Sequence, residues 1–339
     1  MKHIDRQILQ IALPSIVSNI TVPLLGLIDV AIVGHLGSPA YIGAIAVGGM
    51  LFNIIYWIFG FLRMGTSGMT SQAYGKRDLP EIVRLLMRSV GIGLAVALCL
   101  ILLQVPIRQA AFLIIHPTAE VREMATLYFH ICIWGAPAML GLYGLSGWFI
   151  GMQNSRIPMY IAITQNIVNI IASLSFVCFF KMKVEGVAFG TLIAQYAGFI
   201  MGLVLWMSRY GKLKKYILWK GVLQKEAMMR FFQVNRDIFL RTLCLVTVTL
   251  FFTSAGASQG EIILAVNTLL MQLFTLFSYV MDGFAYAGEA LSGRYIGARN
   301  RKAFTNTTRH LFIWGGWLAA FFTLVYALGG NAFLGLLTD

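Results

Sequence analysis

Apolar residues along this chain come in nine long runs that short polar segments separate. Each run reaches the roughly 20 residues that a helix needs to cross the hydrocarbon core of a bilayer. The pattern therefore predicts an all-α polytopic membrane protein. The predicted spans cover residues 8–33, 41–72, 85–106, 121–148, 157–180, 186–208, 231–256, 262–293 and 307–330.

Composition and charge agree with a membrane protein. Of the 339 residues, 58% are hydrophobic and only 12% are charged, whereas charged residues make up about 25% of soluble domains. A net charge of +13 would suggest nucleic acid as a partner of a soluble chain. With a cytoplasmic N-terminus, however, nineteen of the 26 lysines and arginines fall at cytoplasmic helix ends and four on the other side. We therefore expect a multi-pass protein of the cell's inner (plasma) membrane and no nucleic-acid partner.

The sequence contains no recognisable catalytic or metal-binding motif. The four cysteines lie within apolar runs without paired spacing, and the five histidines lack ligand spacing. Neither a phosphate-binding loop of the Gly-x4-Gly-Lys-Ser/Thr type nor a nucleophile elbow occurs. The prediction is a protein that is not an enzyme and that uses no cofactor and no metal site.

Asp29 is the main candidate for a functional residue, because it lies inside the first span. A charge within hydrocarbon costs at least ~2.5–3.5 kcal/mol, so such a residue is by default functional. Burial disfavours the charged form of a carboxylate, which suits a group that binds and releases a proton. The alternative is a hydrated carboxylate near the outer interface, since the span ends about four residues later. Pro23 can kink this helix at the turn of Asn19, as a hinge or as a packing feature.

Uncharged polar residues in the fifth and sixth spans are the predicted neighbours of Asp29. Asn166, Asn169 and Ser173 are spaced three and four residues apart, which places them on one helical face. We group Gln195 in the sixth span with them as a polar residue of the substrate cavity.

The second and eighth spans end alike. Residues 65–78 (GTSGMTSQAYGKRD) and 287–300 (AGEALSGRYIGARN) share small residues, a terminal glycine, an arginine and then Asp or Asn. Superposing Gly75 on Gly297 gives an offset of 222 residues, and internal duplication is typical of two-lobed transporters. We predict an N-terminal six-helix lobe at 1–208, a basic cytoplasmic linker at 209–230 and a partial C-terminal lobe of three helices at 231–339.

Three further charged residues lie deep in the predicted spans: Arg63, Asp282 and Glu289. Counted from the two equivalent glycines, Arg63 lies level with the gap between the two acids, about 5–6 Å from each. Because intramembrane charges are usually paired, we hypothesise that Arg63 pairs with one of the acids across the lobe interface. Separate pairing within each lobe is the alternative.

Several motifs together resemble the multidrug and toxic compound extrusion (MATE) transporters, most closely the DinF-like branch. They are residues 13–29 (LPSIVSNITVPLLGLID), 34–37 (GHLG), 59–73 (FGFLRMGTSGMTSQA), 151–158 (GMQNSRIP), 235–242 (NRDIFLRT) and 282–290 (DGFAYAGEA). The resemblance implies twelve helices in two six-helix lobes, with Asp29 as the coupling carboxylate of the first lobe. It also implies export of amphipathic, often cationic compounds against an inward proton or sodium gradient. The nine spans are three fewer than twelve, so we expect a piece of the transporter or a short form.

One departure from the family bears on the coupling ion. Some relatives carry a second acid in the fifth helix, one turn after an asparagine, whereas here Ser173 follows Asn169. Sodium-coupled relatives of another branch use an acid in the seventh helix, and residues 242–257 contain none. We therefore predict a proton-coupled multidrug antiporter, probable partners aside from lipid being the small-molecule substrate and H⁺, acting as a monomer.

Two alternatives remain within the superfamily. One is a Na⁺-coupled drug antiporter, and the other is a lipid-linked saccharide flippase. Flippases of that kind usually line the cavity with several basic residues, but here only Arg63 lies inside a span away from the interface. A channel or receptor is the third class, which saturable flux that reverses with the proton gradient would exclude.

Overall fold

The computed structural model describes residues 2–35, 37–258 and 261–338. Within these ranges nine helical stretches are long and apolar enough to cross a membrane, which confirms the predicted all-α polytopic fold. The α-helices are α1 Lys2–Gly34, α2 Pro39–Ile58, α3 Phe61–Lys76, α4 Leu79–Leu102, α5 Gln104–Ile115, α6 Ala119–Cys132, α7 Ala136–Gly151, α8 Arg156–Leu174, α9 Val184–Tyr210, α10 Lys225–Ser258, α11 Glu261–Gly297 and α12 Arg301–Thr338. Helices α2 and α3 together form one span, as do α6 and α7.

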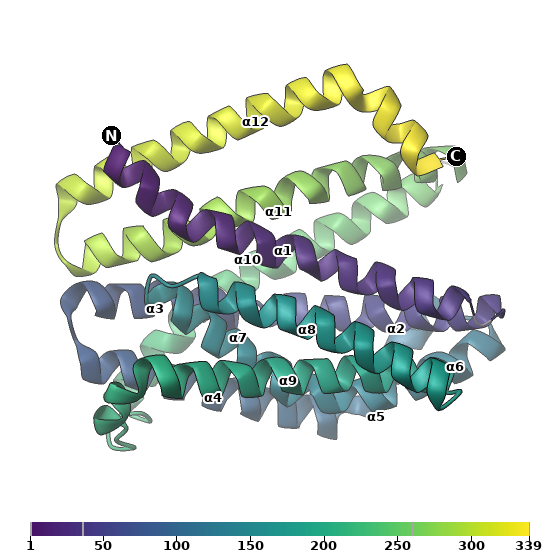
Figure 1. The fold of residues 1–339 in the computed structure, drawn as a ribbon, viewed down its shortest axis with the longest axis horizontal. Helices are drawn as coiled ribbons and strands as arrows, with labels where there is room; N and C mark the ends of the chain where they lie inside the picture. The colour runs from purple at the N-terminus through teal and green to yellow at the C-terminus, as the bar shows by residue number, and fades with distance from the viewer. Residues whose placement is uncertain (1, 36, 259–260, 339) are drawn as a thin grey trace.

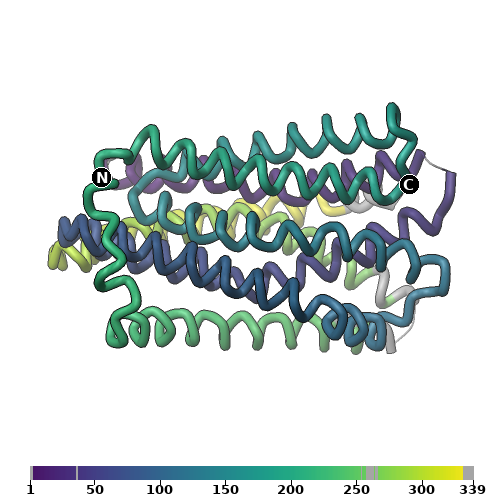
Figure 2. The backbone as a smooth tube through the Cα atoms, turned by 90° about the horizontal axis from the view of Figure 1, so that it is seen from below, coloured from purple at the N-terminus to yellow at the C-terminus, as the bar shows by residue number. Residues whose placement is uncertain are grey.

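The helices run along the long axis of the molecule, and α1 crosses between two groups of them (Figure 1). Its most extensive contacts are with α11 on one side and α8 on the other. Helix α10 runs along one edge of the bundle (Figure 2). The first turns of α1 and the last turns of α12 lie at opposite ends, as an odd number of crossings requires. The shared position of α1 explains why residues along it contact both groups.

The third predicted span, 85–106, needs correction. Helix α4 begins earlier, because the Asp78 side chain accepts a hydrogen bond from the backbone N–H of Glu81 and caps the helix at 3.1 Å. It ends at Leu102, four residues before Pro106, whose ring would clash with that carbonyl and whose nitrogen cannot donate. The chain then continues as the separate 12-residue helix α5, which the apolar pattern alone did not distinguish from the span.

The two similar segments form the same turn. Arg77 and Arg299, 222 residues apart, both adopt left-handed backbone angles, with φ of 59° and 53°. The next residue in each, Asp78 or Asn300, donates its backbone N–H six residues back, to Ala73 or Tyr295, at 3.0 and 2.9 Å. This is a Schellman ending, and Asp78 and Asn300 then cap the following helices. The shared sequence therefore ends one helix and starts the next.

The two segments also pack against each other. A Cβ at Gly75 would overlap the carbonyl oxygen of Arg294, and a Cβ at Gly297 would overlap that of Gln72. Gln72 and Arg294 are themselves 222 residues apart, so the two contacts are equivalent. On the axis between them, a Cβ at Gly293 would overlap the Ser71 hydroxyl. The glycines that mark the repeat thus allow α3 and α11 to meet backbone to backbone.

A buried arginine holds the loop that follows α9. Arg88 is 3% exposed and donates hydrogen bonds to the Glu81 carboxylate at 2.7 Å and to the carbonyls of Gly221 and Val222 at 2.8 and 2.7 Å. Its charge is therefore fully bonded, and part of the segment between α9 and α10 is fixed to α4.

Candidate functional site

Asp29 lies inside the bundle and is 4% exposed. Thr191 of α9 donates its hydroxyl to Asp29 Oδ2 at 3.4 Å, and Asn169 of α8 donates its amide to the Thr191 hydroxyl at 3.1 Å. Three helices therefore supply one chain of hydrogen bonds that ends on the carboxylate. The hydrated alternative for Asp29 does not hold, because α1 continues to Gly34 and neighbouring helices cover the side chain.

The predicted polar stripe on α8 divides into two parts. Asn169 and Ser173 are fully buried, whereas Asn166 is half-buried and donates its amide to the carbonyl of Ala162 in its own helix. Ser173 packs where α8 meets α9, since a Cβ at Gly190 would overlap its hydroxyl. Asn169 is therefore the member of the stripe that reaches the Asp29 chain.

Sequence reasoning missed Thr191 and included Gln195 instead. The two residues lie one helical turn apart on α9, so they share a face. Gln195 packs against Gly135, where a Cβ would overlap its side-chain oxygen, and the structure gives it no hydrogen bond to Asp29. The spacing of Thr191 and Gln195 was the available signal, but a threonine in an apolar span is common and did not stand out.

The Asp29 carboxylate has no basic partner in the described ranges. The ion pairs found there within 4.0 Å do not include it, and its Oδ1 atom has no hydrogen-bond donor. An unpaired charge inside a protein is costly, so such a group is stable when a proton or a cation neutralises it. The same ranges hold no cluster of three or more His, Cys, Asp or Glu side chains suited to a metal.

A second charged site joins α3 to α11. Arg63 Nη1 lies 3.8 Å from Glu289 Oε2, and the guanidinium carbon lies 3.8 Å from the ring centroid of Tyr286. The side chains of Arg63 and Glu289 are only 16% and 21% exposed. Of the two acids considered for Arg63, the structure thus places Glu289 beside it and leaves Asp282 exposed without an ion pair to a described residue. The acids are two turns apart, about 10 Å, so one guanidinium reaches only one of them.

Helix α1 passes through both of its prolines without ending. Pro14 leaves the carbonyl of Gln10 without its helical donor, and the Ser155 hydroxyl of the neighbouring helix start donates to it at 3.4 Å. At the turn weakened by Pro23, the Asn19 amide donates to the carbonyl of Tyr279 at 3.1 Å and accepts from the Tyr286 hydroxyl at 3.4 Å. The candidate hinge is therefore bonded to α11.

A pocket of about 570 Å³ opens between the α2–α3 break and α10. Four phenylalanines, Phe59, Phe61, Phe232 and Phe239, line it together with Asn235, which is 2% exposed. A site of this size and apolar lining fits a drug-sized molecule.

Together these features define a class: an integral membrane transporter built from two helical lobes. A family model described as MatE matches residues 14–174 and 238–339. The chain belongs to the MATE family, in its DinF-like branch.

Curated relatives and solved structures agree. The DNA damage-inducible protein F of Escherichia coli (strain K12) is 38% identical over 339 residues, which cover 99% of this chain and 73% of that protein. A probable multidrug resistance protein NorM of Thermotoga maritima is 23% identical over 93% of this chain and 67% of its own length. A MATE crystal structure in a bent conformation superposes with a TM-score of 0.90 at 19% identity, covering 99% of this chain and 75% of that one. An outward-facing MATE structure gives 0.87, also at 19% identity, over 99% and 74%.

Proposed function

We propose that this chain is part of a secondary active exporter that expels amphipathic or cationic compounds in exchange for protons, with Asp29 as the coupling carboxylate. The carrying observation is the burial of Asp29 with one hydroxyl donor and no basic partner in the described ranges. Such a carboxylate is stable when protonated and unstable when it loses the proton, so proton uptake and release change the energy of the surrounding helices.

The proton on Asp29 would act through α1. This helix holds Asp29 against α9, and it holds Asn19 against α11 near Pro23. Loss of the proton would strengthen the demand of Asp29 for hydrogen-bond donors, and α1 can respond by bending at Pro23. We propose that the bend couples the lobe at 1–208, through the linker at 209–230, to the part at 231–339.

The aromatic pocket supports amphipathic substrates. Phenylalanine faces attract cations and bury apolar groups, and the side-chain oxygen of Asn235 has no donor in the described ranges. A flippase that holds lipid-linked phosphates would need several basic residues in the interior, and Arg63 is already bonded to Glu289 and Tyr286. The geometry therefore favours a drug exporter over a flippase.

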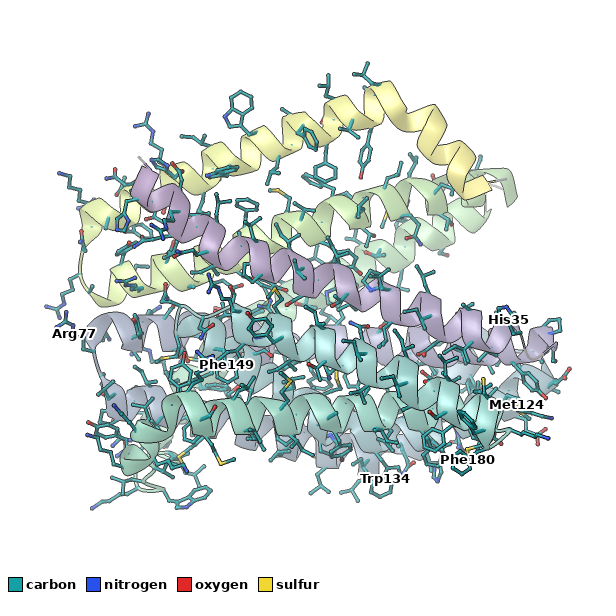
Figure 3. All side chains as sticks on the ribbon, in the orientation of Figure 1. His35, Arg77, Met124, Trp134, Phe149 and Phe180 are labelled. Atoms are coloured by element: carbon teal, nitrogen blue, oxygen red, sulfur yellow. The ribbon has the colours of Figure 1, made fainter. Side chains whose placement is uncertain are left out.

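Orientation and placement follow from the charged helix ends. Arg77 lies at one end of the bundle and His35 at the other (Figure 3). We propose that the Arg77 end, which carries most lysines and arginines, faces the cytoplasm of a bacterial inner membrane.

The test is proton flux in proteoliposomes on addition of an amphipathic cation, compared among the native chain, Asp29→Asn and Asp237→Asn. Asp237 is the matched control, because its side chain is 71% exposed and pairs with the adjacent Arg236. We expect drug-dependent proton release that Asp29→Asn abolishes and Asp237→Asn keeps. Full proton-coupled flux in Asp29→Asn would exclude Asp29 as the coupling group, and drug flux driven by sodium alone would replace the proton with Na⁺.

A further inference from the structure

A second pocket, of about 500 Å³, opens beside the first turns of α1, far along the chain from Asp29. Helix α1 supplies most of its lining, and Arg156, the first residue of α8, closes one side. It lies at the end of the bundle where the N-terminal turns of α1 and Arg77 are found (Figures 1 and 3). Because a helix end marks the edge of the hydrocarbon, this pocket faces the headgroup region of a bilayer.

Two guanidinium groups in this pocket have no counter-charge. Arg6 and Arg156 are both exposed, and neither takes part in an ion pair within 4.0 Å in the described ranges. The one acid of the pocket, Asp5, is engaged elsewhere: its Oδ1 lies 2.8 Å from His310 Nδ1 and accepts a hydrogen bond from Trp314 Nε1 at 3.1 Å. The pocket therefore offers two free cationic forks to an anion.

The rest of the lining is apolar and leads into the membrane. Leu9, Leu13 and Pro14 follow Arg6 along α1, and Leu13 is 54% exposed. The spacing of Arg6, Leu9 and Leu13 keeps them on one face of the helix, which Val17, 41% exposed, continues. From Arg6 to Val17 the face extends about 16 Å. A charged end joined to an apolar stripe of this length has the layout of a phospholipid, with the headgroup at the helix end and the acyl chain along it.

We propose that this pocket is a binding site for an anionic phospholipid. The phosphate lies between Arg6 and Arg156, and one acyl chain follows Leu9, Leu13 and Val17. The free guanidinium pair selects an anionic headgroup over a zwitterionic one, and the apolar stripe selects a lipid over a soluble phosphate. The bound lipid links α1 to α8 next to the contact of Asp5 with α12.

The experiment is native mass spectrometry of the full chain in detergent with dioleoylphosphatidylglycerol, dioleoylphosphatidylcholine or inorganic phosphate. The test variant is Arg6→Gln with Arg156→Gln. The control variant is Lys302→Gln with Arg309→Gln, which removes two exposed positive charges from α12 outside the pocket. Each basic residue near a bilayer surface contributes on the order of a factor of five to anionic lipid binding, so we expect about 30-fold weaker binding of phosphatidylglycerol in the test variant.

The expected result is tight phosphatidylglycerol binding by the native chain and the control variant, with weak binding by the test variant and of phosphatidylcholine by all three. Equal loss in both variants would overturn the site in favour of general surface charge. Equal binding of inorganic phosphate and of the lipid would overturn the lipid assignment. Thermal unfolding in detergent alone shows that each variant is folded, and no step depends on transport or on Asp29.

Discussion

At the scale of single residues, Thr191 determines what Asp29 can do. A hydroxyl has one hydrogen to donate and can accept at the same time, so Thr191 can accept from Asn169 while it donates to Asp29. Neither Asn169 nor Asp29 hydrogen-bonds the other directly in the described ranges, and the threonine carries the connection between α8 and α1.

Thr191→Val should therefore weaken the site while it keeps the shape of the side chain. The buried amide of Asn169 loses its acceptor and Asp29 loses its donor, so we expect a cost of about 1–3 kcal/mol in stability and slower proton-coupled transport. Thr191→Ser, which restores the hydroxyl, should restore transport. Thr126→Val is the control, since that exposed hydroxyl bonds only the carbonyl of Arg122 in its own helix. Equal transport by Thr191→Val and the native chain would show that the hydroxyl has no part in coupling.

At the scale of helices, two crossings related by the 222-residue offset differ in one residue. Gly283 of α11 lets α1 come close, since a Cβ there would lie 2.9 Å from the carbonyl oxygen of Ala12. The equivalent residue of α3 is Phe61, whose ring lies 6.0 Å from that of Phe239 on α10. The phenylalanine keeps α10 away from α3, and the aromatic pocket lies in the space between them.

The backbone contact of α3 with α11 can be tested at two glycines of one helix. Gly75→Ala should destabilise the chain by about 1–3 kcal/mol, because its Cβ would overlap the carbonyl oxygen of Arg294, which is backbone and cannot rotate away. Gly68→Ala should be neutral or stabilising by up to about 1 kcal/mol, because no atom lies within 4 Å of the added Cβ and alanine favours a helix. Thermal unfolding in detergent measures both. A Gly75→Ala variant as stable as Gly68→Ala would contradict the close contact.

At the scale of the whole molecule, α1 is the helix that both groups share. Its Asp29 bonds α9, its Asn19 bonds α11, and its Asp5 contacts α12. A change of charge at Asp29 therefore has a rigid route to the interface, although the direction of the motion depends on contacts that two states would form differently.

The Arg63–Glu289 pair is the most direct test of that interface. Arg63→Gln leaves Glu289 mostly buried without a partner, so we expect a loss of up to about 3 kcal/mol in stability, reduced by the remaining exposure of the pair. Arg63→Glu alone should be worse, and Arg63→Glu with Glu289→Arg should recover part of the loss. Recovery is incomplete because the Tyr286 ring then faces an anion. Thermal unfolding and drug efflux check both effects, and Arg63→Glu with Asp282→Arg, which should give no recovery, is the control.

The sequence alone was sufficient for the number of spans, the all-α class, the family, and the depth of Asp29, Arg63 and Glu289. Hydrocarbon forces each crossing to be a helix of fixed rise, so length and apolar pattern translate directly into depth. Rotation about each helix axis and the choice of neighbours come from packing, which the pattern does not contain. Only the tertiary structure therefore showed that Thr191 links Asn169 to Asp29, that Arg63 lies beside Glu289 and Tyr286, and that Asn166 bonds its own helix.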